Sequence, residues 1–159
     1  MKKNDDKTNA LRILDKCGAK YIYHVIETNH ALSGVEAAKA LEMPVEKVFK
    51  TLVTISKSRS LYVFVIPCAK ELNLKKAAKA VGEKSVEMLK QADLLPFTGY
   101  VHGGCSPVGM KKFFTTIIDS STEIQKSIVI SAGKIGHHAE LELTELEKAI
   151  KFSLADVAE

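Results

Sequence analysis

The sequence has 159 residues, of which 46% are apolar and 26% are charged, a composition typical of a globular domain. Its formal net charge of +4 is a mild basic excess, which is compatible with a nucleic-acid partner but does not require one. Three widely spaced cysteines exclude a disulfide framework and a CxxC metal knuckle, and no apolar run approaches the roughly 20 residues of a membrane span. We therefore expect one cytoplasmic domain, residues 1–159, without a signal peptide or a membrane partner.

Apolar periodicity and turn residues divide the chain into short helices and strands. In chain order, the expected elements are a helix over 6–17, a strand over 21–27, helices over 35–41 and 44–49, strands over 50–56 and 61–67, a helix over 72–82, a strand over 85–89, a helix over 91–95, strands over 115–119, 127–131 and 139–143, and a helix over 145–150. Because helices and strands are interspersed, and residues 50–67 predict a hairpin, we expect an α/β fold with a mixed sheet.

Individual residues mark several helix boundaries. Pro96 is expected to end the helix that precedes it, and Gly82 is expected to end the helix over 72–82. Three helix starts carry a capping signal: Asn4 or Asp5 before the first helix, Ser33 with Glu36 at the second, and Thr144 with Glu147 at the last.

The segment TGYVHGGCSPVGMKK, residues 98–112, holds four glycines and a proline. A phosphate-binding P-loop would need GxxxxGK[ST], but Met110 follows the second glycine of that spacing, and the GxGxxG of dinucleotide folds is absent. Such a loop can instead line a small pocket with bare backbone N–H groups that hold a carbonyl or an oxyanion. The alternative is a tight structural connection, and we favour the pocket because the glycines are so dense.

Three further features could carry chemistry. Lys50 stands between a predicted helix and a strand, where its ammonium would reach a pocket mouth or, as an isolated lysine often does, stay on the surface. Cys105 lies three residues after His102, but without a third orienting group the thiol is expected to be buried rather than nucleophilic. His137 and His138 are neighbours that would point to opposite faces of a strand, so a metal site is not expected.

Five lysines are candidates for a basic surface. They are Lys75, Lys76, Lys79, Lys111 and Lys112. Lysines of this kind usually form a solvated face. Together with the net positive charge, however, they could hold a phosphate backbone through contacts that do not depend on base sequence.

Five motifs stand in the order, and at about the spacing, of the YbaK/EbsC family, whose members are relatives of the editing domain of bacterial prolyl-tRNA synthetase. The motifs are VFKTLV, LNLKKAAKAVGEKSVEM, TGYVHGGCSPVGMKK, TTIID and VISAGKIG. The resemblance spans roughly residues 8–156, and within the family the chain most resembles the YbaK branch. It implies a single compact α/β domain with a mixed, partly barrel-like sheet surrounded by helices.

The resemblance also implies roles for individual residues. Lys50 matches the lysine on which the family depends, and Thr51 matches the threonine beside it. Gly103 and Gly104 match the paired glycines whose backbone lines the aminoacyl pocket, and their N–H groups would stabilise an oxyanion. Lys50 and Gly103 are thus the implied catalytic positions. The other expected members of that pocket wall are Ser106, Pro107 and Gly109.

Two regions depart from the family pattern. Where relatives often carry a tyrosine in the first strand region, this chain has Ile26, with Tyr23 nearby. Where YbaK-like relatives often carry an arginine and then an aspartate in the second glycine loop, this chain has Ile135 and His138. Tyr23, Ile26 and His138 are therefore the candidate substrate contacts in these regions.

By resemblance, the expected activity is a trans-editing hydrolysis that removes a mischarged amino acid from the 3′ end of tRNA, with no metal and no cofactor. Cysteine on proline tRNA, Cys-tRNA(Pro), is the expected substrate, with Cys-tRNA(Cys) as a further one. Prolyl-tRNA synthetase is the expected protein partner, and the five lysines would contact the acceptor stem. The substrate thiol would attack its own ester carbonyl, which explains why no Ser–His–Asp set is found. Two alternatives stay open: the same chemistry on alanyl-tRNA, and a non-catalytic RNA-binding module of this fold.

Overall fold

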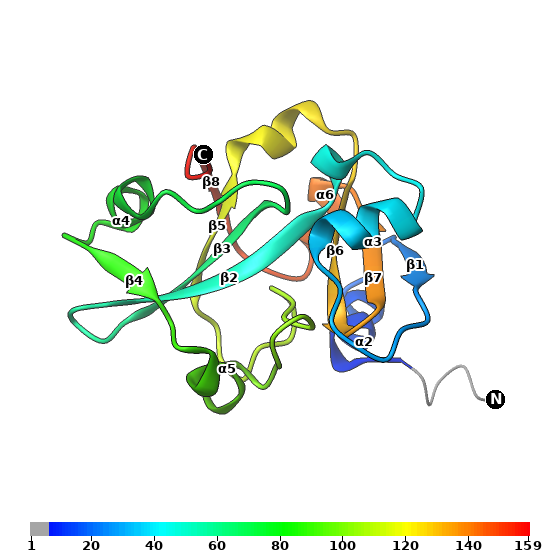
Figure 1. The fold of residues 1–159 in the computed structure, drawn as a ribbon, viewed down its shortest axis with the longest axis horizontal. Coiled ribbons are helices and arrows are strands. Elements are labelled where there is room, and N and C mark those ends of the chain that lie inside the picture. Colours follow the sequence, from blue (N-terminus) through cyan, green and yellow to red (C-terminus); the bar gives the residue numbers. More distant parts are fainter. Residues whose placement is uncertain (1–6) are drawn as a thin grey trace.

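The computed structural model describes residues 7–159, whose strands form two sheets (Figure 1). The five-stranded sheet has the order β4 (Val86–Met88), β2 (Phe49–Ser56), β3 (Leu61–Pro67), β5 (Thr115–Asp119) and β8 (Ser153–Ala155). The three-stranded sheet has the order β1 (Ile22–Val25), β7 (His137–Leu141) and β6 (Ile128–Lys134). The sheets meet at a parallel bridge between Val48 and Val129, and they do not close into a barrel.

The hairpin of β2 and β3 is the centre of the larger sheet. Both strands are rich in β-branched and aromatic residues, and they pair antiparallel from Phe49 opposite Pro67 to Ile55 opposite Leu61. β3 then pairs parallel with β5, and β5 pairs parallel with β8. The predicted hairpin and the mixed sheet of an α/β fold are therefore confirmed.

The two faces of the five-stranded sheet carry different elements. α4 (Leu74–Val81) packs with Phe64 of β3. The glycine loop, residues 98–112, follows α5 (Gln91–Thr98) and packs through Tyr100 with Val63 of β3. Because consecutive residues of a strand point to opposite faces, α4 and the glycine loop lie on opposite sides of the sheet (Figure 1).

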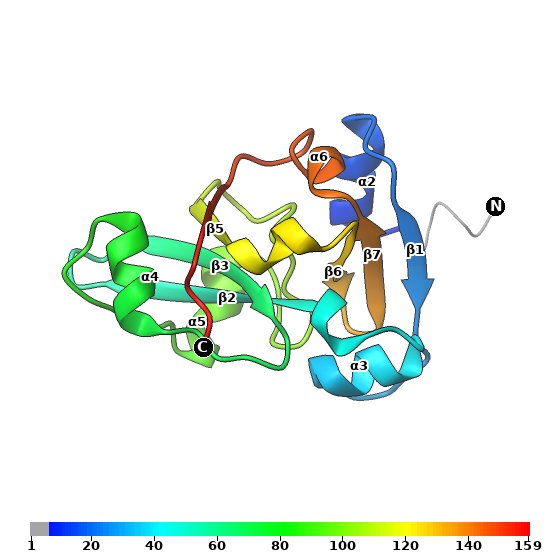
Figure 2. The ribbon, with the colours of Figure 1, turned by 90° about the horizontal axis from the view of Figure 1, so that it is seen from above.

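The remaining helices surround the smaller sheet and the connections. They are α2 (Asn9–Lys16), α3 (Gly34–Ala40), α6 (Leu143–Leu146) and the 3₁₀ helices η1 (Val45–Lys47) and η2 (Ser120–Ile124). Leu11 of α2 and Leu146 of α6 are buried with Ile130 of β6, and Figure 2 shows α3 beyond the end of β1. None of the helices in residues 7–159 has the length and apolar character needed to cross a lipid bilayer.

Two predicted helix boundaries are confirmed. The Ser33 hydroxyl accepts a hydrogen bond from the Glu36 N–H at 3.1 Å, and the Glu36 carboxylate accepts one from the Ser33 N–H at 2.9 Å, which completes the capping box. Gly82 ends α4 with a φ of 74°, a left-handed conformation that glycine adopts at little cost.

Two helix starts differ from the prediction. The Thr8 side chain caps α2 by accepting a hydrogen bond from the Leu11 N–H at 3.2 Å, and the expected caps Asn4 and Asp5 lie outside the described residues. The helix predicted over 44–49 is a single 3₁₀ turn, η1, because the residues that follow it already belong to β2.

Two further predicted boundaries are wrong. α5 does not stop at Pro96 but continues for two residues beyond it. Pro96 has no N–H, so within the helix only the Ala92 carbonyl loses its hydrogen-bond donor. Ala92 is exposed, so water can donate to that carbonyl instead. α6 begins at Leu143 with Glu142 as its N-cap, so the capping box expected from Thr144 does not form.

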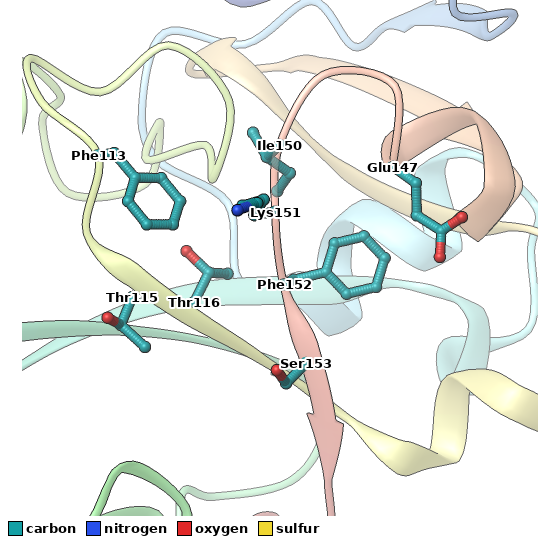
Figure 3. A pocket seen from close by; sticks show the side chains of 8 residues that line it. All are labelled: Phe113, Thr115, Thr116, Glu147, Ile150, Lys151, Phe152 and Ser153. Atoms are coloured by element: carbon teal, nitrogen blue, oxygen red, sulfur yellow. The ribbon is translucent and has the colours of Figure 1, made fainter.

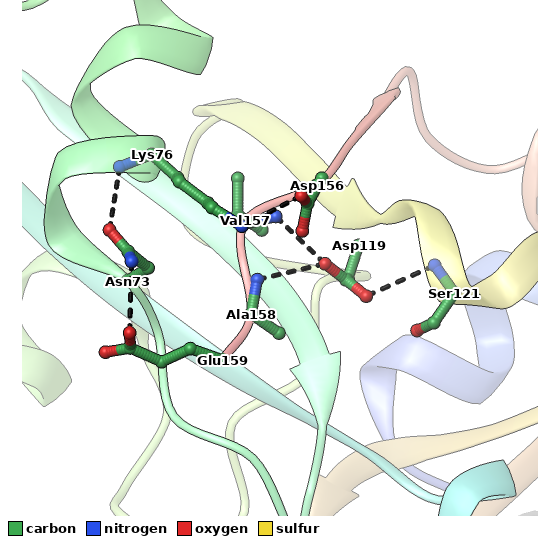
Figure 4. Close-up of polar contacts among 8 residues, drawn as sticks. All are labelled: Asn73, Lys76, Asp119, Ser121, Asp156, Val157, Ala158 and Glu159. Atoms are coloured by element: carbon green, nitrogen blue, oxygen red, sulfur yellow. Dashed lines mark hydrogen bonds and ion pairs between the residues drawn. The ribbon is translucent and has the colours of Figure 1, made fainter.

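Asp119 anchors the C-terminal segment to the five-stranded sheet (Figure 4). Its carboxylate, on a residue only 4% exposed, accepts hydrogen bonds from the backbone N–H groups of Val157 at 2.9 Å and Ala158 at 3.0 Å, and from that of Ser121 at 3.1 Å. Burial alone would raise the pKa of this carboxyl, but the hydrogen bonds outweigh burial and hold the pKa below its usual value. The ionised group thus stabilises the fold.

Replacing Asp119 with asparagine should lower the free energy of unfolding by about 2 kcal/mol at neutral pH, because backbone donors lose a charged acceptor. The pKa of Asp119 is lower in the folded than in the unfolded state. Its stabilising effect is therefore complete above the pKa of Asp119 in the unfolded state, and it is lost as the pH falls through the pKa of Asp119 in the folded state. Urea denaturation at neutral and acid pH should show that the difference between wild type and Asp119→Asn shrinks in acid.

Asp156→Asn is the matched control for this prediction. Asp156 lies in the same C-terminal segment, but its carboxylate is exposed and pairs with the Lys76 ammonium at 2.8 Å (Figure 4). An exposed pair contributes little to stability, so this variant should unfold close to wild type. An equal loss of stability in both variants would show that Asp119 is not the anchor.

Candidate functional site

A cavity of about 280 Å³ lies where the two sheets separate. Its walls come from β2, the start of α3, the residue after β3, the glycine loop and the hairpin of β6 and β7. The lining residues are Leu32, Ser33, Gly34, Ala37, Val48, Phe49, Lys50, Thr51, Leu52, Cys68, Leu94, His102, Gly103, Cys105, Ser131 and His138. Lys50, Thr51, Gly103 and His138, which the sequence placed at the site, thus share one cavity.

Lys50 and Thr51 reach the cavity because one edge of β2 is only partly covered. β3 covers the other edge along the strand, whereas β4 pairs only with Thr54–Ser56. The first residues of β2 therefore border the cavity instead of a neighbouring strand. The Lys50 side chain is half-buried there, so its ammonium acts in a space that is partly shielded from water.

Gly103 occupies a tight turn. The Gly104 N–H donates a hydrogen bond to the Val101 carbonyl at 3.0 Å, and this bond closes a four-residue turn around His102 and Gly103. The φ of Gly103 is 88°, in the left-handed region that the second central residue of a type II turn requires. The Gly103 N–H has no partner among the described residues. The expectation that both glycines offer a free N–H is therefore wrong for Gly104, whose N–H is used within the loop.

The glycine pair also allows the loop to approach the second sheet. A Cβ atom on Gly103 would lie 2.7 Å from the Ala31 Cβ, closer than such atoms come in proteins. A Cβ atom on Gly104 would lie 3.2 Å from the Ile135 backbone nitrogen and 3.3 Å from the main chain of Lys134. Atoms of neighbouring segments therefore occupy the space that side chains at positions 103 and 104 would need.

Ser106, Pro107 and Gly109 were expected to complete the same wall, but none of them lines this cavity. Ser106 is fully buried, and its hydroxyl accepts a hydrogen bond from the Val108 N–H at 3.2 Å. Pro107 and Gly109 line a separate cavity of about 200 Å³. The chain therefore turns away from Lys50 after Cys105.

The hairpin of β6 and β7 contributes a neutral imidazole. His138 lines the cavity, and its Nδ1 is buried without a hydrogen-bond partner among the described residues. Burial lowers the pKa of His138 below its usual value, so the ring is uncharged at neutral pH. Residues 7–159 contain no cluster of three or more His, Cys, Asp or Glu side chains that could hold a metal ion.

Tyr23 and Ile26, the other candidate substrate contacts, lie outside this cavity. Tyr23 stacks on His137 with ring centroids 5.7 Å apart, and its hydroxyl contacts His137 Nδ1. The Ile26 N–H donates to the Gly136 carbonyl at 2.7 Å. Both residues therefore support the hairpin of β6 and β7 rather than the wall beside Lys50.

Two buried thiols line the cavity, and of these Cys68 is not predicted by any sequence motif. The Cys68 N–H donates to the Val48 carbonyl at 2.8 Å, so the register of the β2–β3 hairpin was the signal that could have placed Cys68 beside β2. Burial raises the pKa of Cys105 to about 12. Burial also raises the pKa of Cys68, an effect that the charge of Lys50 partly offsets. Neither thiol is therefore poised to act as a nucleophile.

The five candidate lysines lie in two groups. Three are on α4, where Lys76 pairs with Asp156. The other two are the last residues of the glycine loop, where the Lys111 ammonium donates to the Pro96 carbonyl at 3.1 Å. Because α4 and this loop lie on opposite faces of the five-stranded sheet, the five lysines do not form one continuous basic surface. Lys111 and Lys112 alone belong to the loop that walls the cavity.

A larger cavity, of about 450 Å³, lies elsewhere on the molecule (Figure 3). Figure 3 shows Phe113 and Phe152 on either side of Lys151, with threonines of β5 below them. Glu147 also lines this cavity, and no residue that the sequence placed at the site does so. Size alone therefore does not identify the functional site.

Comparisons with known proteins show the family to which the chain belongs. The model of a family described as the aminoacyl-tRNA editing domain matches residues 28–149, a range that includes Lys50 and Gly103. The candidate Cys-tRNA(Pro)/Cys-tRNA(Cys) deacylase EbsC of Enterococcus faecalis is 43% identical over 141 residues, which are 88% of this chain and 86% of that protein. A proline–tRNA ligase of Thermosipho melanesiensis is 27% identical over 115 residues, which are 72% of this chain and 20% of the ligase.

Solved structures share the fold. The crystal structure of a hypothetical protein matches with a TM-score of 0.86 at 23% identity, covering 96% of this chain and 100% of that one. The crystal structure of a candidate trans-editing enzyme for prolyl tRNA synthetase matches with a TM-score of 0.81 at 21% identity, covering 96% of this chain and 98% of that one. The arrangement of the two sheets is therefore a known fold.

Iodoacetamide should modify Cys17 in the folded protein and leave Cys105 unmodified. Cys17 is exposed, whereas Cys105 is buried and its pKa of about 12 leaves almost no thiolate near neutral pH. Mass spectrometry of tryptic peptides measures the two sites separately. Denatured protein is the control, since both cysteines should then react. Equal labelling of the two sites in the folded protein would show that the Cys105 thiol is accessible and ionised.

Proposed function

Because this chain belongs to the family of aminoacyl-tRNA editing domains, we propose that it deacylates mischarged tRNA and that Cys-tRNA(Pro) is its substrate. The observation that carries the proposal is the shared cavity of Lys50 and Gly103, which brings together a lysine and a glycine whose N–H has no partner among the described residues. The similarity to EbsC supports cysteine as the amino acid that is removed, and Cys-tRNA(Cys) as a second substrate.

The size of the cavity favours a small esterified amino acid. Its space of about 280 Å³, walled partly by backbone, must hold the amino acid together with the ribose to which it is esterified, which leaves little room for a bulky side chain. A pocket of this kind distinguishes one methylene by only about 1–3 kcal/mol, so cysteine, alanine and serine all fit. The choice among them must therefore depend on the chemistry of the side chain.

A cysteinyl ester carries its own nucleophile. Its sulfur attacks its own carbonyl carbon, so a C–S bond forms, the bond to the ribose oxygen breaks, and the thiol proton passes to that oxygen. The products are free tRNA and a cysteine thiolactone, which water opens to cysteine. The protein then has only to hold the sulfur against the carbonyl, and such orientation can supply roughly 7 kcal/mol or more. Both protein thiols in the cavity have raised pKa values, which is consistent with the substrate thiol acting as the nucleophile.

Lys50 and Gly103 complete the reaction site. The Gly103 N–H stabilises the oxyanion of the tetrahedral intermediate, a contribution typically worth about 3 kcal/mol. The Lys50 ammonium holds the ester end of the tRNA by donating hydrogen bonds to its oxygen atoms. His138 is kept neutral by burial, so it adds no second positive charge and can accept a hydrogen bond from the substrate.

We propose that prolyl-tRNA synthetase is the protein partner, and that the two proteins meet in the cytoplasm. The similarity to one fifth of a proline–tRNA ligase supports the partner, because in that ligase the related segment is covalently joined to the rest of the enzyme. Association would give this chain the same proximity to a mischarged tRNA. The small cavity and the thiol of the substrate account for the amino acid that is removed, and the synthetase accounts for the choice of tRNA.

The purified protein should clear the cysteinyl ester of proline tRNA faster than the alanyl or prolyl ester, because the cysteinyl ester alone has an internal thiol. Lys50→Ala should lower kcat/KM by about 10²–10³, the usual effect of removing one group that stabilises the transition state. The release of labelled amino acid from the tRNA measures each rate.

Lys57→Ala is the matched control, because Lys57 is an exposed lysine at the far end of the same strand pair, and this variant should keep wild-type activity. Thermal melting shows whether Lys50→Ala stays folded. Faster clearance of the alanyl ester would favour an alanyl-tRNA deacylase. Tight binding of tRNA without turnover of any ester would favour a non-catalytic RNA-binding module.

Cys105→Ala should keep most of the deacylase activity, because the thiol is buried and protonated and the reaction uses the sulfur of the substrate. The measurement is kcat/KM on the cysteinyl ester. Loss of turnover with an unchanged melting temperature would instead identify Cys105 as a protein nucleophile.

A further inference from the structure

A second cavity, of about 420 Å³, lies beside the cavity that holds Lys50. Three segments of the chain line both cavities with neighbouring residues. The segment that leads into α3 supplies residues 28–30 to the second cavity and 32–34 to the Lys50 cavity. The glycine loop supplies 99–101 to the second cavity and 102–103 to the Lys50 cavity. The β6–β7 hairpin supplies 133–135 to the second cavity, and 131 and 138 to the Lys50 cavity. The two cavities are therefore the two sides of one thin partition.

The partition is made of small groups. Gly103 meets Ala31 and Ile135 there: a Cβ atom on Gly103 would lie 2.7 Å from the Ala31 Cβ and 3.7 Å from Ile135 Cγ1. Ala31 and Gly103 are both exposed, so the rim of the partition is at the surface. An extended ligand can thus cross the rim with one unit in each cavity.

The lining of the second cavity combines basic, polar and apolar groups. Lys134 supplies an exposed ammonium, His30 and Asn29 supply hydrogen-bonding groups, and Val101, 48% exposed, supplies an apolar surface with Ile135. No carboxylate lines this cavity. A nucleotide needs these three kinds of contact, for its phosphate, its ribose and base edges, and its base face.

The His30 ring is oriented by its neighbours. His30 Nδ1 lies 3.1 Å from the Asn29 side-chain oxygen, which can only accept, so Nδ1 carries a proton. The Thr28 hydroxyl fixes the same turn, since it donates to the His30 carbonyl at 2.9 Å. Nε2 has no partner among the described residues. It can accept a hydrogen bond from a hydroxyl or amino group of a ligand.

We propose that this second cavity binds the nucleotide that precedes the terminal adenosine of the tRNA, with Lys134 on the phosphate between the two and His30 on the ribose or base. The proposal rests on the proposed function, since it requires the aminoacyl ester to occupy the Lys50 cavity. The cavity of Figure 3 is a poorer candidate, because its lining comes from residues 113–116 and 147–153, segments that supply nothing to the Lys50 cavity.

The experiment compares two short esters, 3′-cysteinyl adenosine and 3′-cysteinyl cytidylyl-adenosine, which differ by one nucleotide and its phosphate. Wild type should hydrolyse the dinucleotide ester with a kcat/KM about tenfold higher, mainly through a lower KM, as expected for one charge-assisted contact. Lys134→Ala and His30→Ala should each reduce this gain while hydrolysing the adenosine ester at the wild-type rate. On Cys-tRNA(Pro), both variants should raise KM and leave kcat unchanged.

Two further variants serve as controls. Lys134→Arg keeps the positive charge and should retain most of the gain. Lys57→Ala removes an exposed lysine that lies outside both cavities and should behave as wild type.

The outcomes separate this inference from the proposed function. If wild type gains nothing from the extra nucleotide, or if the gain survives both Lys134→Ala and His30→Ala, the second cavity is not a nucleotide site although the deacylase stands. An equal loss of activity on both short esters would assign these residues to folding or to the Lys50 cavity instead. If wild type hydrolyses neither the short esters nor Cys-tRNA(Pro), the proposed function fails and this inference falls with it.

Discussion

The close contact between Gly103 and Ala31 is the constraint on which the arrangement of the site depends. The glycine loop packs on the five-stranded sheet, and at this contact it also meets the segment before α3 and, through Ile135, the smaller sheet. Any side chain at position 103 would stand 2.7 Å from the Ala31 Cβ and would push the loop away. The absence of a side chain therefore lets the loop form both the wall of the Lys50 cavity and the partition between the two cavities.

The Lys50 cavity brings one positive charge together with groups that burial keeps neutral. Lys50 is half-buried, His138 is kept uncharged by burial, and the thiols of Cys68 and Cys105 stay protonated because burial raises their pKa. Charge interactions are stronger in a space partly shielded from water. An oxyanion formed in this cavity would therefore meet a single ammonium and the N–H of Gly103, with no competing anion among the lining residues.

The sequence predicted best what is decided locally. The β2–β3 hairpin and the Ser33 capping box depend on residues a few positions apart, and both are confirmed. That Lys50 and Gly103 line one cavity followed from the family resemblance, because no local pattern relates residues so distant in the chain. The use of the Gly104 N–H inside its turn could not be predicted, since it depends on the path of the loop. For the same reason the direction of the chain after Cys105, which removes Pro107 from the wall, appeared only in the structure.

The two buried thiols have a consequence for an enzyme that handles cysteine. Mixed disulfides form when a thiolate attacks an oxidised sulfur, and the rate rises with the fraction of thiolate present. Cys68 and Cys105 border the space in which, under the proposed function, cysteine is released over and over. Because both side chains stay protonated, cystine or other oxidised products that reach the cavity would find no reactive partner, and the protein would resist inactivation by its own product.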